Sequence, residues 1–361
     1  MPSPVERALR DISRCRTSAL VGHLYACESC GGEVPVYNFC LNRHCPQCQS
    51  RARNRWLEAR MQDLLPVPYF HVVFTIPAEL RPFFRGDPRA LYNILFKATW
   101  GTLREVVADP KRLGAQPGAL AVLHTWNQQL LAHPHIHLVV PGGGLDDDGK
   151  WIPSSPTFLF HVKALAKKFA GRFIHLLDRA VTRNEVWLPT DMQQSPSLYV
   201  TTRDALRQKS WKVYAKPPFG GPEQVLRYLA RYTHRVAIGN SRIVSLENDH
   251  VTFRFKKRSS EPEWKTKRLP AVEFLRRFTL HVLPPGFVRI RYFGFLANRN
   301  RRKAVTACRD QLGGQIVDEA IRKVEAEGPA TGPRCPTCEQ ATLVQIRGLP
   351  RQPPHSRGPP L

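Results

Sequence analysis

The sequence HPHIHLVVPGGG, residues 133–144, places two histidines on either side of one isoleucine at the start of an apolar run. In a β-strand, residues two positions apart project from the same face, so the side chains of His135 and His137 would lie next to each other. Such a pair is typical of metal sites, but histidine is also an ordinary residue of half-buried strands. The stretch therefore predicts a strand and leaves two interpretations open, a metal site and simple packing.

The sequence on both sides of this strand predicts a mixed α+β fold. Two apolar runs that precede it, YFHVVFTI (69–76) and ALAVLHTWN (119–127), have the length and composition of buried strands. Between them, Asp87 and Pro88 are a typical beginning of a helix. The later runs RIVSLEN and HVTFRFKKR predict a hairpin. Because strands and helices do not alternate regularly, we expect a central antiparallel sheet with flanking helices over residues 66–300, and not a doubly wound parallel sheet.

The charge of the chain indicates a polyanionic partner. Its 361 residues include 54 Lys and Arg against 29 Asp and Glu, which gives a formal net charge of +25. An excess of this size, spread over the whole chain, favours binding to nucleic acid. No apolar stretch approaches the ~20 residues of a transmembrane helix, and the N-terminus lacks the apolar core of a secretory signal. We therefore expect a cytoplasmic protein that binds nucleic acid and no membrane.

Residues 1–65 predict a zinc-ribbon-like module. Cys27 and Cys30 form one CxxC pair, and Cys45 and Cys48 form a second pair after fourteen intervening residues. Each pair can offer two thiolates to one ion, and two pairs complete a tetrahedral structural zinc site. In a reducing cytoplasm, this pattern favours metal binding over disulfides.

The residues around these pairs add two expectations. Cys40 and His44 lie between the pairs, so either one could replace a ligand or contact one. The helical pattern that follows, QSRARNRWLEARMQDLL, carries Arg51, Arg53 and Arg55. We expect these arginines to contact DNA phosphates, and the alternative is an ordinary solvated helix face.

Residues 301–361 predict a basic C-terminal tail rich in proline and glycine. Its end, RGLPRQPPHSRGPPL, lacks the apolar residues of a packed core, so we expect the tail to be partly disordered. Cys335 and Cys338 form another CxxC pair there, which is half of a zinc site with no second pair after it. A site completed by His355, a dimer contact and a remnant without a role all stay open.

The sequence PEQVLRYLARYTHRVAI predicts a helix with Tyr228 and Tyr232 four residues apart, hence on one face. Tyrosines at this spacing are usually packing residues. Here, however, Arg227, Arg231 and Arg235 flank them, and nearby cations favour the phenolate form of tyrosine. A phenolate can attack phosphorus when a metal ion polarises the phosphate. The tyrosines and the histidine pair are therefore complementary parts of a phosphoryl-transfer site, where the arginines would bind DNA.

The combination of these motifs resembles a known class of enzymes. A His-hydrophobic-His strand followed by YxxxY on a helix is similar to the two-tyrosine HUH endonucleases. The order and spacing of CLNRHCPQCQ, YFHVVFTIP, HPHIHLVVPGGG, YLARYTHRVAI and VRIRYFGFLANR resemble the insertion-sequence-91 family of rolling-circle transposases, from about residue 10 to about residue 310. The resemblance implies an HUH endonuclease domain between the zinc module and the tail.

The resemblance also implies a reaction. Tyr228 or Tyr232 would cleave one strand of single-stranded DNA at the end of a mobile element and remain attached as a 5′-phosphotyrosine. The other tyrosine would accept a second strand, so that cleavage and rejoining need no ATP. The implied partners are single-stranded DNA at the element ends and target, together with host replication and helicase functions. The implied location is the bacterial cytoplasm, in association with the nucleoid.

The resemblance implies the cofactors as well. His135 and His137 would hold a catalytic Mg²⁺ or Mn²⁺ ion, and a third polar ligand would come from a neighbouring element. His124, on the adjacent predicted strand, is the preferred third ligand, because a pleated neighbour can reach the same face. Gln128 and Gln129 are the alternatives. Zinc in the N-terminal module would be structural.

Two other functions stay open at this point. A plasmid replication initiator or conjugative relaxase would use the same histidines and tyrosines. A non-catalytic, zinc-dependent DNA-binding protein would share the charge and the cysteines, but it would not need both histidines and both tyrosines.

Overall fold

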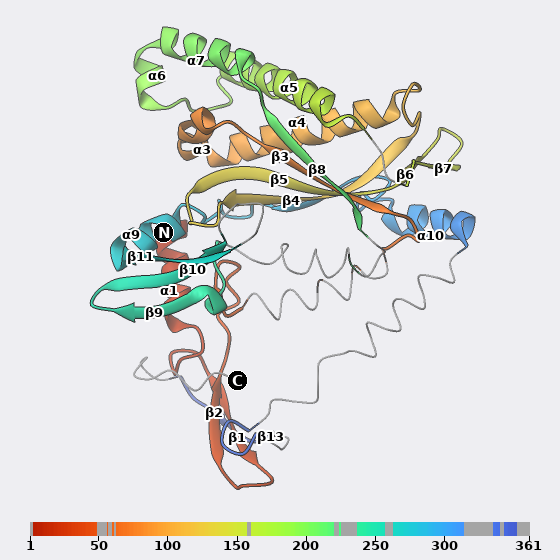
Figure 1. Cartoon of the computed structure of the whole chain (residues 1–361). Coiled ribbons are helices and arrows are strands. Elements are labelled where there is room, and N and C mark those ends of the chain that lie inside the picture. Colours follow the sequence, from red (N-terminus) through yellow and green to blue (C-terminus); the bar gives the residue numbers. More distant parts are fainter. Residues whose placement is uncertain are drawn as a thin grey trace.

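The computed structural model describes residues 3–48, 56, 60, 63–156, 160–219, 224, 237–256, 263–313, 335–339 and 343–351. Within these residues, a seven-stranded sheet has the strand order β7-β6-β4-β5-β3-β8, with β12 paired to β4 (Figure 1). The strands are β3 (Tyr69–Thr75), β4 (Gln116–Trp126), β5 (Ala132–Pro141), β6 (Gly143–Leu145), β7 (Trp151–Pro153), β8 (Lys212–Phe219) and β12 (Ile290–Gly294). All of these pairings are antiparallel, which confirms the predicted central sheet.

Helices cover one face of this sheet (Figure 1). They are η1 (Ala78–Leu80), α3 (Arg81–Gly86), α4 (Pro88–Ala108), α5 (Val162–Thr182), α6 (Thr190–Gln194) and α7 (Pro196–Gln208). On β3, Val72 and Phe74 are fully buried in the core that these helices form. The predicted start of α4 is present, because the Asp87 side chain accepts a hydrogen bond from the Ala90 N–H and Pro88 is the first helical residue. This apolar layer holds the strands that carry the histidines.

The opposite face of the sheet carries the histidines. Ile136 lies in the main core, so His135 and His137, on either side of it, project from the other face. Elsewhere on that face, a second core packs against α10 (Arg301–Leu312), whose Val305 is buried there. Residues 301–312, the first part of the predicted tail, thus form a helix with an apolar side against the sheet.

A second, three-stranded sheet contacts the turn between β4 and β5. It has the order β11-β10-β9, and the predicted hairpin is β9–β10. Its elements are η2 (Asn240–Arg242), β9 (Ile243–Glu247), β10 (His250–Lys256), β11 (Trp264–Pro270) and the following helix α9 (Ala271–Thr279). These elements share a small core with Leu130 of the β4–β5 turn, which fixes this sheet beside the histidine strands.

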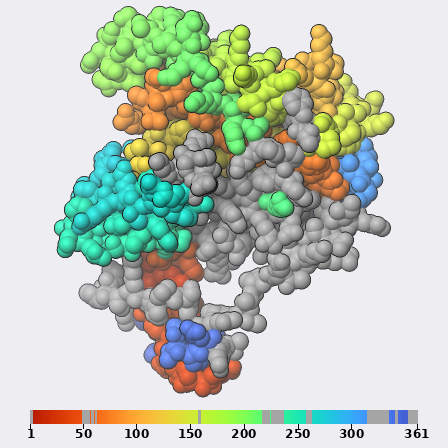
Figure 2. Space-filling view, in the orientation of Figure 1, coloured from red at the N-terminus to blue at the C-terminus, as the bar shows by residue number. Residues whose placement is uncertain are grey.

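The two ends of the described chain meet in a third sheet. Helix α1 (Pro4–Arg14) is followed by β1 (Gly22–Cys27) and β2 (Glu33–Tyr37), and the strand β13 (Leu343–Leu349) pairs with β1. Figure 2 shows β13, in blue, against the red N-terminal residues at the lower end of the molecule. The predicted C-terminal tail, expected to be partly disordered, therefore includes an ordered strand at Leu343–Leu349. Among the described residues, no helix combines the length and apolar character that crossing a membrane requires.

Candidate functional site

Three histidines from two neighbouring strands converge on the face of the central sheet opposite the helices. In the β4–β5 register, His124 pairs with His135, and Val122 pairs with His137. The ring centroids of His124 and His137 are 4.3 Å apart, and those of His135 and His137 are 4.8 Å apart. One ring nitrogen from each histidine lies within 4.8 Å of the other two. One divalent ion can therefore contact all three imidazoles.

Two contacts orient these imidazoles. The Nδ1 atom of His135 donates a hydrogen bond to the His133 carbonyl oxygen, at 2.6 Å, so Nε2 is the ring nitrogen that could bind a metal ion. The Nδ1 atom of His137 lies 2.8 Å from Nε2 of His71 on β3, and the two rings are nearly parallel. A histidine that binds a metal ordinarily donates its other ring N–H to such a neighbour. His71 is thus a positioning residue that the sequence analysis missed.

The signal for His71 in the sequence is a histidine within the apolar run YFHVVFTI, which marks a polar side chain in a buried strand but not its neighbours. It lies within an otherwise apolar strand, 2% exposed, two positions from Val73, which pairs with His137. Residues two apart share a face, so the register of β3 and β5 places His71 beside the histidine pair. That register is not readable from the sequence, because it depends on pairing between strands far apart in the chain.

Gln129, an alternative third ligand in the turn between β4 and β5, contacts another strand. The Gln129 side-chain oxygen accepts a hydrogen bond from Lys267 Nζ at 2.8 Å, so this side chain is directed to β11. The fully buried His281 packs against this turn and stabilises it. Its Nε2 donates a hydrogen bond to the Leu130 carbonyl oxygen, and its Nδ1 accepts one from the Thr125 hydroxyl. Burial lowers the pKa of His281 to about 4, which keeps it neutral.

The other predicted site residues belong to segments that the structure does not describe. The catalytic tyrosines and the DNA-binding arginines of the sequence analysis lie outside the described residues; they are Tyr228, Tyr232, Arg227, Arg231, Arg235, Arg51, Arg53 and Arg55.

The four predicted zinc ligands do not form one site. Cys45 and Cys48 lie with Cys15 and Cys40 in a first four-cysteine cluster. Cys27 and Cys30 lie with Cys335 and Cys338 in a second one. All nine cysteines of the chain are in described segments and none forms a disulfide. The grouping of the two N-terminal CxxC pairs around a single ion was therefore wrong, although each of the four cysteines belongs to a cluster that could hold a metal ion.

The hairpin β1–β2 explains this error. Cys27 ends β1 at the turn, and β2 then carries the chain back over five residues before Cys40. A strand advances about 3.3 Å per residue, so Cys27 and the second CxxC pair are at opposite ends of a ribbon about 16 Å long. Cys40 is a member of the first cluster and His44 is not.

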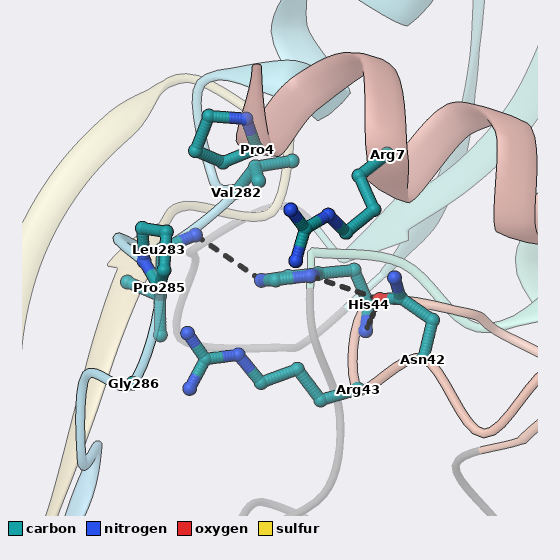
Figure 3. Close-up of a pocket in the computed structure, with 9 residues that line it drawn as sticks. All are labelled: Pro4, Arg7, Asn42, Arg43, His44, Val282, Leu283, Pro285 and Gly286. Atoms are coloured by element: carbon teal, nitrogen blue, oxygen red, sulfur yellow. Dashed lines mark hydrogen bonds between the residues drawn. The ribbon is translucent and has the colours of Figure 1, made fainter. Parts of the chain in front are cut away.

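His44 instead connects the N-terminal cysteine loop to the segment that follows α9 (Figure 3). Its Nε2 accepts a hydrogen bond from the Leu283 N–H at 3.1 Å, and its Nδ1 lies 3.1 Å from Asn42 Oδ1. The neighbouring Arg43 donates to the carbonyl oxygens of Phe287 and Pro284, at 2.5 and 2.8 Å. These contacts connect the loop of the first cysteine cluster to the segment after α9.

The burial of His44 in this contact should make the stability of the protein depend on pH. Burial, together with the positive charges of Arg43 and Arg289, lowers the pKa of His44 to about 4. An imidazole that remains neutral in the folded state but takes up a proton below about pH 6.5 in the unfolded state favours unfolding as the pH falls. We expect the free energy of unfolding of the wild type to fall, relative to that of His44→Asn, by on the order of 3 kcal/mol between pH 6.5 and 4.

Chemical denaturation of both proteins across this pH range measures the difference. Loss of zinc in acid affects both proteins, so the difference isolates the imidazole. Parallel pH profiles of the two proteins would contradict the prediction.

Comparison with known proteins identifies two families. Residues 118–304 match the family described as "Putative transposase", and residues 1–76 match the "Transposase zinc-binding domain". The "Putative transposase y4qJ" of Sinorhizobium fredii (strain NBRC 101917 / NGR234) is 44% identical over 351 residues, which are 94% of this chain and 88% of that protein. The transposase for insertion sequence element IS801 of Pseudomonas savastanoi pv. phaseolicola is 30% identical over 306 residues, 81% of this chain and 72% of that protein. No solved structure matches the chain.

The matches agree with the geometry. The zinc-binding family covers the first cysteine cluster and the hairpin β1–β2, and the transposase family covers β4 and β5 with the three histidines. The relatives span nearly the whole chain and are transposases by name. The chain belongs to the insertion-sequence-91 family of transposases, which act on DNA and carry an N-terminal zinc-binding domain.

Proposed function

We propose that this transposase cleaves and rejoins single-stranded DNA by metal-assisted tyrosine transesterification. The observation that supports this proposal is the convergence of His124, His135 and His137 from two adjacent strands, with one ring nitrogen of each within 4.8 Å of the others. Three neutral imidazoles occupy only part of the coordination sphere of a divalent ion, so positions remain for phosphate oxygens. Tyr228 and Tyr232 are the proposed nucleophiles.

The histidine donors fit a catalytic Mg²⁺ or Mn²⁺ ion. When bound, such an ion polarises the scissile phosphate and stabilises the charge that develops on its oxygens. Of the two, Mn²⁺ accepts nitrogen ligands more readily, because Mg²⁺ is a harder ion that prefers oxygen. The His133 carbonyl and His71 hold the rings of His135 and His137 in the orientation that binding requires.

The proposed reaction exchanges one ester for another. The phenolic oxygen of one tyrosine attacks the phosphorus and gives up its proton, the bond between phosphorus and the 3′-oxygen breaks, and the departing 3′-oxygen takes up a proton. The products are a 5′-phosphotyrosine and a free 3′-OH, which can prime host replication. In the rejoining step, a 3′-OH attacks the phosphotyrosine and the tyrosine recovers its proton. The second tyrosine allows two strands to be held at once.

The sheet β9–β11 provides a surface for single-stranded DNA beside this site. Arg254 and Lys256 lie on the same face as Trp264, whose side chain is 52% exposed. Lys256 Nζ is 5.2 Å from the Trp264 ring centroid. An exposed aromatic ring among cations is typical of proteins that stack bases and neutralise phosphates of single strands. Host helicase and replication functions would supply the separated strand, at the bacterial nucleoid.

The test is a cleavage assay on a labelled single-stranded oligonucleotide that carries the element end, with Mn²⁺ or Mg²⁺, resolved on a denaturing gel. We expect a covalent DNA–protein adduct that requires metal and that is absent from the Tyr228→Phe/Tyr232→Phe and His135→Ala/His137→Ala proteins. Tyr37→Phe, which changes a tyrosine of β2 in the N-terminal hairpin, is the matched control and should retain the adduct.

The single variants Tyr228→Phe and Tyr232→Phe identify the first nucleophile, because only the loss of that tyrosine should abolish the adduct by itself. If the wild type binds the oligonucleotide without cleavage or adduct, the proposal fails, and a non-catalytic DNA-binding role replaces it. An adduct that survives in the double-Phe protein would also refute it, because another residue would then be the nucleophile.

A further inference from the structure

The second cysteine cluster joins residues from both ends of the chain. Cys27 and Cys30 lie at the turn between β1 and β2, and Cys335 and Cys338 precede β13. The Sγ atoms of Cys27 and Cys338 are 3.6 Å apart, and those of Cys30 and Cys335 are 3.7 Å apart. Disulfide sulfurs are about 2.05 Å apart, whereas thiolates around one zinc ion, at ~2.3 Å each, are about 3.8 Å apart. The spacing is that of a tetrahedral zinc site.

The backbone positions the thiols in both halves of this cluster. In the first half, the Gly31 N–H donates to the Cys27 carbonyl oxygen at 2.8 Å, and Gly31 has a positive φ of 69°, which closes a tight turn around the thiols. In the second half, the Thr337 N–H points at Cys335 Sγ, at 3.4 Å.

Apolar burial contributes little to holding β13 in place. The core of this sheet contains Val34 and Leu343 as its buried aliphatic side chains, beside the buried Cys27 and Cys335, with Tyr25 and Val36 half-buried against them. Most residues of β13 are exposed, so this small core does little to offset the conformational entropy that ordering the strand costs. A structural zinc ion can offset that cost, because metal binding contributes directly to the folding of small modules.

We propose that Cys27, Cys30, Cys335 and Cys338 bind a second structural zinc ion, which fastens the C-terminal strand β13 to the N-terminal hairpin. The four ligands and the three strands form one zinc ribbon built from both ends of the chain. Two of the ligands lie outside residues 1–76, to which the zinc-binding family extends. The transposase therefore binds two structural zinc ions, and its zinc-binding region is not continuous in sequence.

Zinc analysis of the purified full-length protein tests this proposal. We expect two zinc ions per chain in the wild type and one in Cys335→Ser/Cys338→Ser. Cys27→Ser/Cys30→Ser should lose the same ion. The protein with all four substitutions should therefore still contain one zinc ion per chain. Cys308→Ala, at the one cysteine outside both clusters, is the matched control and should retain two. One zinc in the wild type, or two in Cys335→Ser/Cys338→Ser, would overturn the proposal.

A second measurement uses the wild type alone, so it does not depend on the folding of a variant. Cys30 is exposed, and an exposed thiol without metal reacts readily with iodoacetamide. We expect Cys30 and Cys338 to resist alkylation until a chelator is added, and the amides of β13 to lose hydrogen-exchange protection at the same time. Rapid alkylation of Cys30 in the zinc-loaded protein would refute the site.

Discussion

Replacing His124 with alanine is expected to lower the rate of metal-dependent strand cleavage about 1000-fold. A bound ion contributes several kcal/mol to the stabilisation of transition-state charge, and each 1.4 kcal/mol corresponds to a factor of ten in rate. His124 is 3% exposed, and its ring lies 4.3 Å from that of His137, so its replacement removes one of the three converging ring nitrogens. Single-turnover cleavage of the element-end oligonucleotide, at several Mn²⁺ concentrations, measures the loss.

Two further variants separate metal binding from folding. His71→Leu removes the neighbour of His137 Nδ1 and retains all three proposed ligands, so its loss should be intermediate, about 10- to 100-fold. The matched control is His175→Ala, at an exposed position of α5, which should cleave like the wild type. If His124→Ala cleaved at the wild-type rate at low Mn²⁺ concentration, His124 would not be a ligand. Protein that retains the wild-type circular dichroism spectrum excludes unfolding as the cause.

The arrangement of the three histidines was largely predictable. Alternation in HPHIHLVV places His135 and His137 on one face, and the short connection to ALAVLHTWN makes an antiparallel neighbour the simplest arrangement. His124 then lies opposite His135, as the register shows. This placement of the three histidines depends only on contacts that are local in sequence. His71 was missed because β3 reaches the same face from more than sixty residues away.

The grouping of the cysteines was not predictable by the same reasoning. The CxxC pair of Cys335 and Cys338 is complete only with a partner more than 300 positions earlier, and sequence spacing contains no information on contacts of that length. The separation of Cys30 and Cys45 fits a zinc ribbon, yet the strand β2 between them carries the second pair to the other end of the hairpin. Spacing identifies a metal-binding pair of cysteines, but topology decides which pairs share an ion.

A continuous series of contacts connects the first cysteine cluster to the histidine strands. Arg43 and His44, next to Cys45, bind the segment 283–287. His281, two residues before Leu283, binds the turn between β4 and β5 through Thr125 and the Leu130 carbonyl. The loop that the first cluster organises therefore supports the end of the sheet where His124 and His135 lie. Loss of metal from this cluster should have consequences beyond the zinc module.

Cys45→Ala is accordingly expected to remove one zinc ion per chain and to unfold the loop that docks on residues 283–287. Cys45 is fully buried, and the core of its cluster consists of Cys15, Cys45 and Cys48, with no large apolar side chain among the fully buried residues. Without the metal, worth about 10 to 16 kcal/mol in such modules, little else holds this loop. The central sheet has its own extensive core and should remain folded.

The amide of Leu283 reports on this coupling, because its N–H donates to His44 Nε2. In Cys45→Ala, we expect one zinc ion instead of two and fast hydrogen exchange at Leu283, while amides of β4 and β5 remain protected. The substitution Cys335→Ser/Cys338→Ser also removes one ion but leaves the first cluster intact, so there Leu283 should remain protected. The two variants thus lose equal amounts of zinc with different effects at one amide. If Leu283 exchanged equally in both, the first cluster would have no separate role in docking the zinc module on the catalytic domain.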